Sequence, residues 1–161
     1  MKQDEFKGEI MANLVERALV KPLFQLLQQE RLVTLTTVDP ETKAPNVHAI
    51  SWIYAKNEST LVFAVSNQSK MVENIRLLKH IVITAIVNES IYSISGEATI
   101  KNERIDGITL KLALIELAIT EVRDIMFYGS RISVEPQYSK TYDTVAAEKL
   151  DQQVMEALRK A

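Results

Sequence analysis

The chain of 161 residues contains no cysteine, which excludes disulfide bonds, thiolate catalysis and metal sites built on thiolates. It has only two histidines, His48 and His80, which fall on different predicted elements. Without a third ligand that converges on them, the sequence predicts no metal site. Glycine is also scarce, with four residues dispersed along the chain. The GxGxxG and Walker loops need clustered glycines to bring backbone close to phosphate, so both motifs are excluded.

Acidic and basic residues nearly balance, at a net charge of −2, which argues against duplex nucleic acid as a partner. No apolar run reaches the length of a membrane span, since the run Leu112–Ile115 is bracketed by Lys111 and Glu116. The first ten residues, MKQDEFKGEI, include acids and lack an apolar core, so we expect no secretory signal. These features predict a soluble, cytoplasmic protein without a membrane partner.

The stretch Leu61–Ile75 changes its hydrophobic period halfway. Leu61–Val65 is a short continuous apolar run, which is typical of a strand buried on both faces. After the polar turn Ser66–Ser69, apolar residues recur at helical spacing, at Met71, Val72, Ile75 and Leu78. The stretch therefore predicts a buried strand that leads through a turn into a helix.

The start of this helix is a candidate binding feature. Ser69 suits the N-cap position, and Lys70 follows it. Free N–H groups and the positive end of the helix dipole favour an anion there. A lysine beside that dipole is mildly unfavourable, and an anion held by Ser69, Lys70 and the turn amides would remove the conflict. An ordinary serine cap next to a solvated lysine explains the same residues, and the pattern alone leaves both readings open.

The remaining pattern predicts a single domain over residues 1–161. In chain order we expect an amphipathic helix over 4–20, a helix from 22 to about 29, strands over 31–38, 46–55 and 61–65, a helix over 70–79, strands over 81–87 and 91–101, an apolar helix over 104–122, a strand over 125–135 and a helix over 144–160. Residues 1–20 are read either as a packed arm or as a dimerisation helix. Short turns between most strands indicate an antiparallel α+β fold. Burial of 61–65 and 81–87 on both faces favours a small closed barrel.

Four stretches in this order carry a family resemblance: RLVTLTTV (31–38), PNVHAISW (45–52), FAVSNQSKMVENI (63–75) and SGEAT (95–99). The set resembles the pyridoxamine 5'-phosphate oxidase-like, FMN-binding split-barrel superfamily, and in particular its small bacterial members described as general stress proteins. The resemblance spans roughly residues 23–136. It implies an α+β fold with a six-stranded antiparallel split β-barrel and flanking helices.

The resemblance implies that FMN binds in a cleft at a homodimer interface, with its phosphate held by Ser69 and Lys70 and with Ser66 nearby. The true oxidase has Ser-Arg-Lys at this loop, whereas this chain has Ser69-Lys70 followed by Met71. One cation is therefore missing, and we expect FMN to be held more loosely.

The same resemblance places three residues of the second strand near the cofactor. His48 stands where the family often has an arginine near the phosphate and ribityl chain, and Ser51 and Trp52 would lie along the isoalloxazine ring. Read without the resemblance, His48 is a polar strand residue and Trp52 a core or interface residue.

The resemblance also bounds the activity. The C-terminal sequence LDQQVMEALRKA has no counterpart of the Trp and Arg signature for the pyridoxal substrate, so we do not expect pyridoxamine-phosphate oxidase activity. Because hydride chemistry belongs to the flavin, no catalytic side chain is assigned. The predicted function is an FMN-dependent oxidoreductase that passes electrons between a reduced nicotinamide and an unknown small acceptor. The alternatives are a cofactor-free split barrel that binds a ligand in a stress response, and a haem-binding one with a histidine axial ligand.

Overall fold

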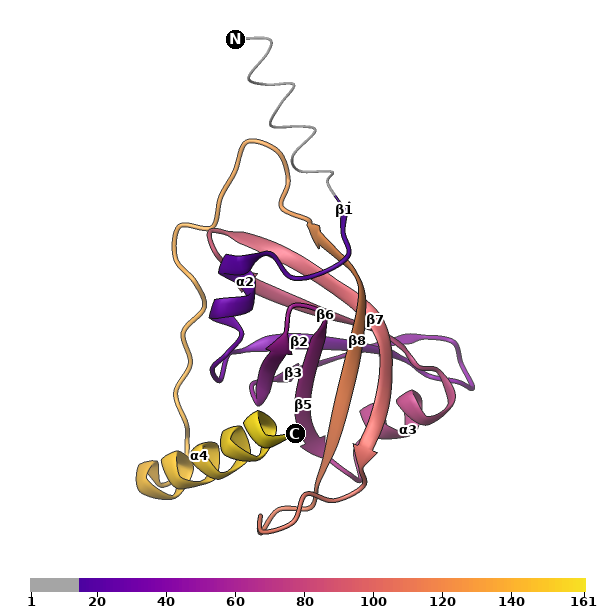
Figure 1. Ribbon diagram of the computed structural model, residues 1–161, viewed down its shortest axis with the longest axis vertical. Coiled ribbons are helices and arrows are strands. Elements are labelled where there is room, and N and C mark those ends of the chain that lie inside the picture. The colour runs from indigo at the N-terminus through magenta and orange to yellow at the C-terminus, as the bar shows by residue number, and fades with distance from the viewer. Residues whose placement is uncertain (1–14) are drawn as a thin grey trace.

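The computed structural model describes residues 15–161, which form one antiparallel sheet with helices packed around it (Figure 1). The elements, in chain order, are β1 (Val15–Glu16), α2 (Lys21–Leu26), β2 (Val33–Val38), β3 (Pro45–Ile50), β4 (Ile53–Asn57), β5 (Thr60–Ser66), α3 (Lys70–Leu77), β6 (His80–Val87), β7 (Ser90–Asn102), β8 (Leu112–Asp124) and α4 (Thr144–Lys160). The long strands β7 and β8 run side by side across the molecule, and α3 and α4 lie on opposite sides of it (Figure 1).

The sheet has the order β3-β2-β6-β7-β8-β5-β4, and β1 pairs with the end of β8. Its two edge strands, β3 and β4, are consecutive in the chain and are joined by Ser51 and Trp52 alone. The backbone oxygen of Ser51 accepts a hydrogen bond from the Arg31 N–H, just before β2, at 3.0 Å. The oxygen of Trp52 accepts one from the N–H of Ala64, in β5, at 3.1 Å. The sheet therefore curls until its two edge strands both reach the dipeptide Ser51-Trp52. The edge strands do not pair with each other, and this open arrangement is a split barrel.

The predicted α+β split barrel is thus confirmed, but the described residues form eight strands where the sequence predicts six. The closed barrel that the burial pattern favours is wrong, because the two edge strands do not pair. The expected single strand over 46–55 is wrong, because the chain turns tightly between β3 and β4. There the N–H of Ile53 donates to the oxygen of Ser51 at 3.0 Å, which closes a three-residue turn.

Strand β5 lies between two apolar layers, as its sequence predicts. Leu61, Phe63 and Val65 belong to the main core, which also takes up buried residues of α2, α3, β2 and β6. Val62 and Ala64 face the other way, into a second cluster with Val154, Met155 and Leu158 of α4. The predicted helix over 144–160 is confirmed, and it covers the outer face of β5. By contrast, β6 is fully buried only at every second residue, so its predicted burial on both faces is wrong.

The predicted apolar helix over 104–122 is wrong, because Leu112–Asp124 forms strand β8. Ala113, Ile115 and Leu117 enter the main core, while Leu112 and Leu114 enter the cluster under α4. A strand that is buried on both faces has a continuous apolar run, and such a run contains residues at helical spacing by default. The sequence period therefore does not distinguish the two structures here.

The predicted strand over 125–135 is also wrong, since these residues form an irregular segment. Its β-formers find no buried face, and Phe127 and Val134 are 70% and 75% exposed. Local contacts fix the segment instead: Ile132 N–H donates to the oxygen of Glu89 at 2.8 Å, and the Glu135 carboxylate pairs with Arg31 at 2.9 Å.

Residues 4–14 of the predicted helix over 4–20 lie outside the described residues. For residues 15–20 the predicted helix is wrong. Val15 and Glu16 form β1, opposite Arg123 and Val122 of β8. The predicted helix at Pro22 is confirmed, with the proline at its first turn, where a missing N–H costs nothing.

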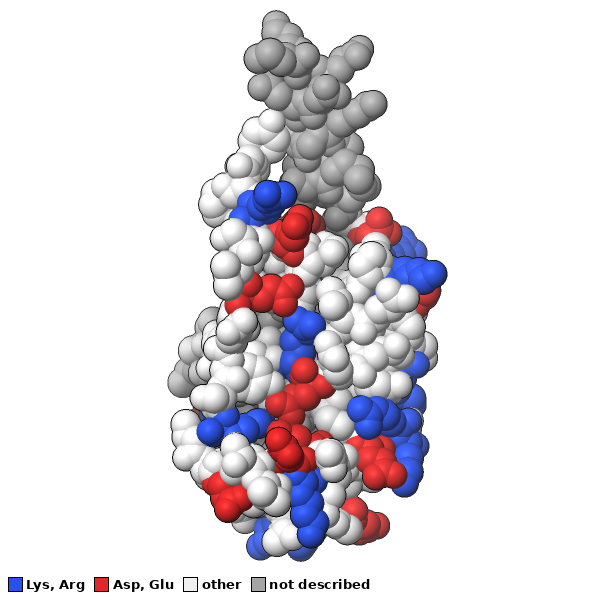
Figure 2. Space-filling model, turned by 90° about the vertical axis from the view of Figure 1, so that its left-hand side faces the viewer, with Lys and Arg blue, Asp and Glu red and all other residues white. Residues whose placement is uncertain are grey.

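Acidic and basic side chains are mixed on the side that carries α4 and the 125–143 segment, without a large area of one sign (Figure 2). Within residues 15–161, no helix combines the length and apolar content that a membrane crossing requires.

The close approach of β7 and β8 generates a first prediction. Gly96 sits at a register shift opposite Ile119, and a Cβ there would overlap the backbone oxygen of Ala118. We expect Gly96→Ala to lower the free energy of unfolding by about 1–3 kcal/mol, because backbone must shift to admit one methyl group. Thr99→Ala, at an exposed position of the same strand, should change it by about 0.5 kcal/mol or less. Urea denaturation measures both, and equal stabilities would contradict the prediction.

Candidate functional site

A pocket of ≈ 360 Å³ lies at the split of the barrel, where both sheet edges meet. It is lined by Ala49, Ile50, Ser51, Trp52, Ala64, Val65, Ser66, Met71, Lys140 and Tyr142. Its volume falls within the range of small-molecule sites. Hollows of ≈ 610 Å³ and ≈ 670 Å³ lie along α4 and beside the 124–131 stretch, but neither contains a residue that the sequence singles out. The pocket at the split is therefore the candidate site.

Trp52 is held in the pocket wall by contacts from the C-terminal part of the chain. Its indole Nε1 donates to Oδ1 of Asp151, on α4, at 2.8 Å. The Nζ of Lys140 lies 5.9 Å from the centre of the indole ring, within the range of a cation–π contact. Lys140 in turn pairs with Asp151 and with Glu30, each at 3.2 Å. These contacts fix both the ring and the lysine at the split.

Tyr138 completes this group, which we call the seam cluster: Glu30, Trp52, Tyr138, Lys140 and Asp151. Its hydroxyl donates to Oε1 of Glu30 at 2.6 Å. Burial, followed by the hydrogen bond to Glu30, raises the pKa of Tyr138 to about 12. Burial disfavours the charge on Lys140, but its hydrogen bonds to the two carboxylates outweigh burial and raise its pKa. The cluster therefore joins α4, the end of the 125–143 segment and the barrel edges through charged hydrogen bonds.

The turn between β5 and α3 has the predicted local structure. The Ser69 side chain accepts a hydrogen bond from the Val72 N–H at 3.4 Å, so Ser69 is the N-cap of α3. Ser66, which lines the pocket, accepts from the Gln68 N–H through its hydroxyl oxygen, also at 3.4 Å. Both hydroxyl protons remain available to a further acceptor, because each contact uses only an oxygen lone pair.

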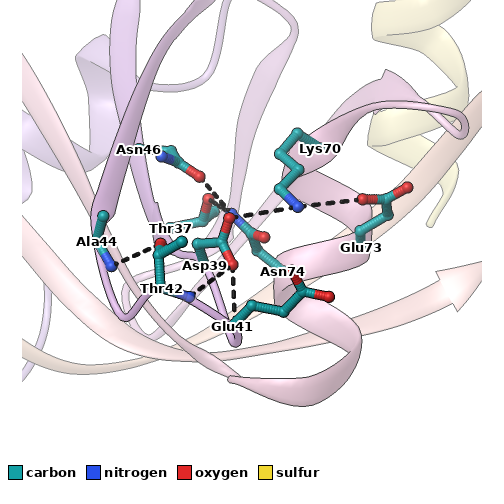
Figure 3. Close-up of polar contacts among 9 residues, drawn as sticks. All are labelled: Thr37, Asp39, Glu41, Thr42, Ala44, Asn46, Lys70, Glu73 and Asn74. Atoms are coloured by element: carbon teal, nitrogen blue, oxygen red, sulfur yellow. Dashed lines mark hydrogen bonds and ion pairs between the residues drawn. The ribbon is translucent and has the colours of Figure 1, made fainter.

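Lys70 follows this cap and contacts two carboxylates (Figure 3). Its Nζ lies 3.4 Å from Oδ2 of Asp39, in the β2–β3 turn, and 3.5 Å from Oε2 of Glu73. The hydrogen bond to Asp39 raises the pKa of Lys70, whereas backbone N–H groups, followed by Lys70, lower the pKa of Asp39. Lys70 is not among the residues that line the pocket, but its side chain is 46% exposed.

His48 lies opposite the buried Leu35 of β2 and does not line the pocket, whereas Ala49 and Ile50, which follow it in β3, both do. The Nδ1 of His48 is buried, and it has no hydrogen-bond partner among residues 15–161. The amide nitrogen of Asn74 donates to Asn46 and to Thr37, each at 2.9 Å (Figure 3). The structure thus gathers Ser51, Trp52 and Ser66 on one pocket, sets Ser69 and Lys70 on the adjoining turn, and leaves His48 out of the pocket lining.

Sequence reasoning did not find Lys140 and Tyr142, which come from a segment without hydrophobic period. The only local signal is the mixture of aromatic and basic residues in YSKTY (138–142). Asp151 gave no signal either, because 99 residues separate it from Trp52.

Comparison with known proteins now bears on the site. A family model described as pyridoxamine 5'-phosphate oxidase matches residues 19–107, which is more than half of the chain. The chain belongs to this family. The match covers β2 to β7 and thus includes the split of the barrel and the start of α3. No curated protein matches the sequence significantly.

Solved structures show the same fold. A candidate pyridoxamine 5'-phosphate oxidase from Lactobacillus delbrueckii is 19% identical, with a TM-score of 0.55 over 66% of this chain and 98% of that one. HupZ from Group A Streptococcus is 14% identical, with a TM-score of 0.57 over 72% of this chain and 99% of that one.

The seam cluster generates a second prediction. Asp151→Ala leaves the Trp52 N–H without its acceptor and should lower the free energy of unfolding by about 1–3 kcal/mol. Because Trp52 is the only tryptophan, its fluorescence emission reports on this site alone, and we expect the emission to shift in the folded variant. Glu156→Ala, at an exposed position of the same helix, is the matched control. Identical emission and stability in both variants would contradict the role of Asp151.

A third prediction concerns alkaline pH. The pKa of Tyr138 in the folded protein, about 12, lies above the value of about 10 for an unfolded tyrosine. Neutral Tyr138 therefore stabilises the fold below pH 10, and this contribution is lost as the pH rises toward 12. The denaturant midpoint of the native chain should fall more steeply over this window than that of Tyr138→Phe. Parallel curves would refute the assignment.

Proposed function

We propose that this chain binds FMN at the split of the barrel and acts as an oxidoreductase that passes electrons between a reduced nicotinamide and a small acceptor. The observation that supports the proposal is the convergence of Ser51, Trp52 and Ser66 on one pocket, with the turn to Lys70 adjoining it. Membership of the pyridoxamine 5'-phosphate oxidase family also supports it.

The donors around the turn suit a phosphate. The hydroxyl groups of Ser66 and Ser69 have free protons, and the first N–H groups of α3 have no acceptor within the helix. Lys70 supplies the positive charge, and its exposure leaves the ammonium group accessible. We assign the phosphate end of FMN to these three side chains.

The walls of the pocket suit a planar ring. Trp52 and Tyr142 offer aromatic surface, and Val65 and Met71 offer apolar surface. When FMN is bound, it supplies hydride transfer at its ring nitrogen N5. The side chains of the pocket would orient the ring and exclude water from it, and the seam cluster would keep Trp52 in place.

We further propose that two copies form the site in a cytoplasmic homodimer. Several large apolar side chains are exposed on β3 and on the 125–143 segment, which is typical of an interaction surface. They are Val47, Ile125, Phe127, Tyr128, Val134 and Tyr142. Tyr142 also lines the pocket, so a second copy that packs against it would close the open side of the pocket.

Titration with FMN tests the proposal. We expect FMN to quench the fluorescence of Trp52 and its two visible absorption bands to shift on binding, with a dimer in analytical ultracentrifugation. The same spectra separate the alternatives, since a haem protein shows a Soret band and a cofactor-free barrel leaves the bands of free FMN unchanged. A colourless monomer whose fluorescence ignores FMN would refute the proposal.

The fourth prediction separates the phosphate contact from the ring contact. Lys70→Ala should weaken FMN binding by about tenfold or more, because a charge-assisted contact is lost. Binding of riboflavin, which lacks the phosphate, should change much less. Lys79→Ala, an exposed lysine beyond the end of α3, serves as the control of equal charge. Equal losses for FMN and riboflavin would show that Lys70 does not contact the phosphate.

A further inference from the structure

The carboxylate of Asp39 occupies the position beside Lys70 that a bound anion would share. Asp39 comes from the β2–β3 turn and Lys70 from the first turn of α3, so two separate elements bring the pair together (Figure 3). Glu73 lies on the other side of the same ammonium group. Lys70 thus has two acidic partners before any ligand arrives.

The two carboxylates differ in how firmly they are held. Asp39 is only 14% exposed, and its Oδ1 accepts the N–H groups of Glu41 and Thr42 at 2.8 and 3.3 Å. These bonds define the turn and do not depend on Lys70, so Oδ2 stays directed at the lysine. Glu73 is 67% exposed, and in the described part of the chain only Lys70 pairs with its carboxylate. Glu73 therefore turns away at little cost, whereas Asp39 is a fixed negative charge.

A fixed carboxylate at this position acts against a phosphate in two ways. It keeps the Lys70 ammonium group in an ion pair that the phosphate must weaken, and it repels the phosphate directly because both groups are negative. Both effects depend on charge and fall with ionic strength. Neither acts on a flavin without a phosphate.

We propose that Asp39 limits the affinity of the site for phosphorylated ligands, so that FMN binds as an exchangeable ligand rather than as a permanently held cofactor. This inference rests on the proposed function, because it concerns the phosphate end of the same site. It makes Asp39 a specificity-determining residue: it sets how far the site prefers FMN over riboflavin.

The substitution Asp39→Asn tests this with little change to the turn. The asparagine oxygen still accepts the two backbone N–H groups, while the charge beside Lys70 is removed. We expect FMN affinity to rise by about tenfold and riboflavin affinity to stay within about twofold. The gain should shrink as salt is raised from low to physiological ionic strength. Glu73→Gln removes the other, equally close charge and should raise FMN affinity by less than about threefold, because that side chain is mobile.

The native chain gives a second readout that needs no variant. Its affinity for FMN should exceed that for riboflavin by less than about tenfold, since Asp39 offsets much of the charge of Lys70. A native chain that binds FMN far more tightly than riboflavin, or an Asp39→Asn variant that leaves this preference unchanged, overturns the inference while the proposed function stands. If neither flavin binds to either protein, the proposed function fails and the inference fails with it.

Discussion

The structure depends on the point where the chain passes from one edge strand of the sheet, β3, to the other edge strand, β4. Ser51 and Trp52 are adjacent, yet their backbone oxygens accept hydrogen bonds from opposite sides of the sheet, one just before β2 and one in β5. Backbone groups that leave a strand must find partners elsewhere. Here the two partners force the edges together without letting β3 and β4 pair. The pocket is the space that this arrangement leaves open, so the fold and the candidate site have one origin.

Local chemistry made much of the fold predictable. Pro22 marks a helix start, Ser69 caps the helix that follows β5, and alternating residues reveal β7. The errors have a common physical cause, which is burial that depends on distant elements. Strand β8 is apolar on both faces because α4 packs on one of them. The hydrophobic period of the sequence alone does not reveal that a helix packs there. Residues 125–135 contain many β-forming side chains but form no strand, because no apolar layer buries these side chains.

The residues of the candidate site likewise fall into two groups: those that the sequence predicts, and those that only the folded chain brings together. Ser69 and Lys70 follow from a strand, a turn and a helix that adjoin in sequence, and Ser51, Trp52 and Ser66 follow from the family resemblance. The seam cluster does not, because Glu30, Trp52 and Asp151 come together only when α4 packs on the barrel. The ion pair between Lys70 and Asp39 could not be predicted from the sequence for the same reason. Asp39 reads as a turn residue, and only the folded β2–β3 turn directs its second oxygen at α3.

The position of α4 also has a consequence for how the chain is made. The helix supplies Val154, Met155 and Leu158 to cover the outer faces of β5 and β8, and it comes last in the described chain. During synthesis those faces stay uncovered while the barrel strands emerge from the ribosome. Exposed strands of this kind are prone to aggregation, and the risk lasts until the missing layer docks. Docking of α4, which follows every strand of the sheet in the chain, is therefore the step that covers these faces.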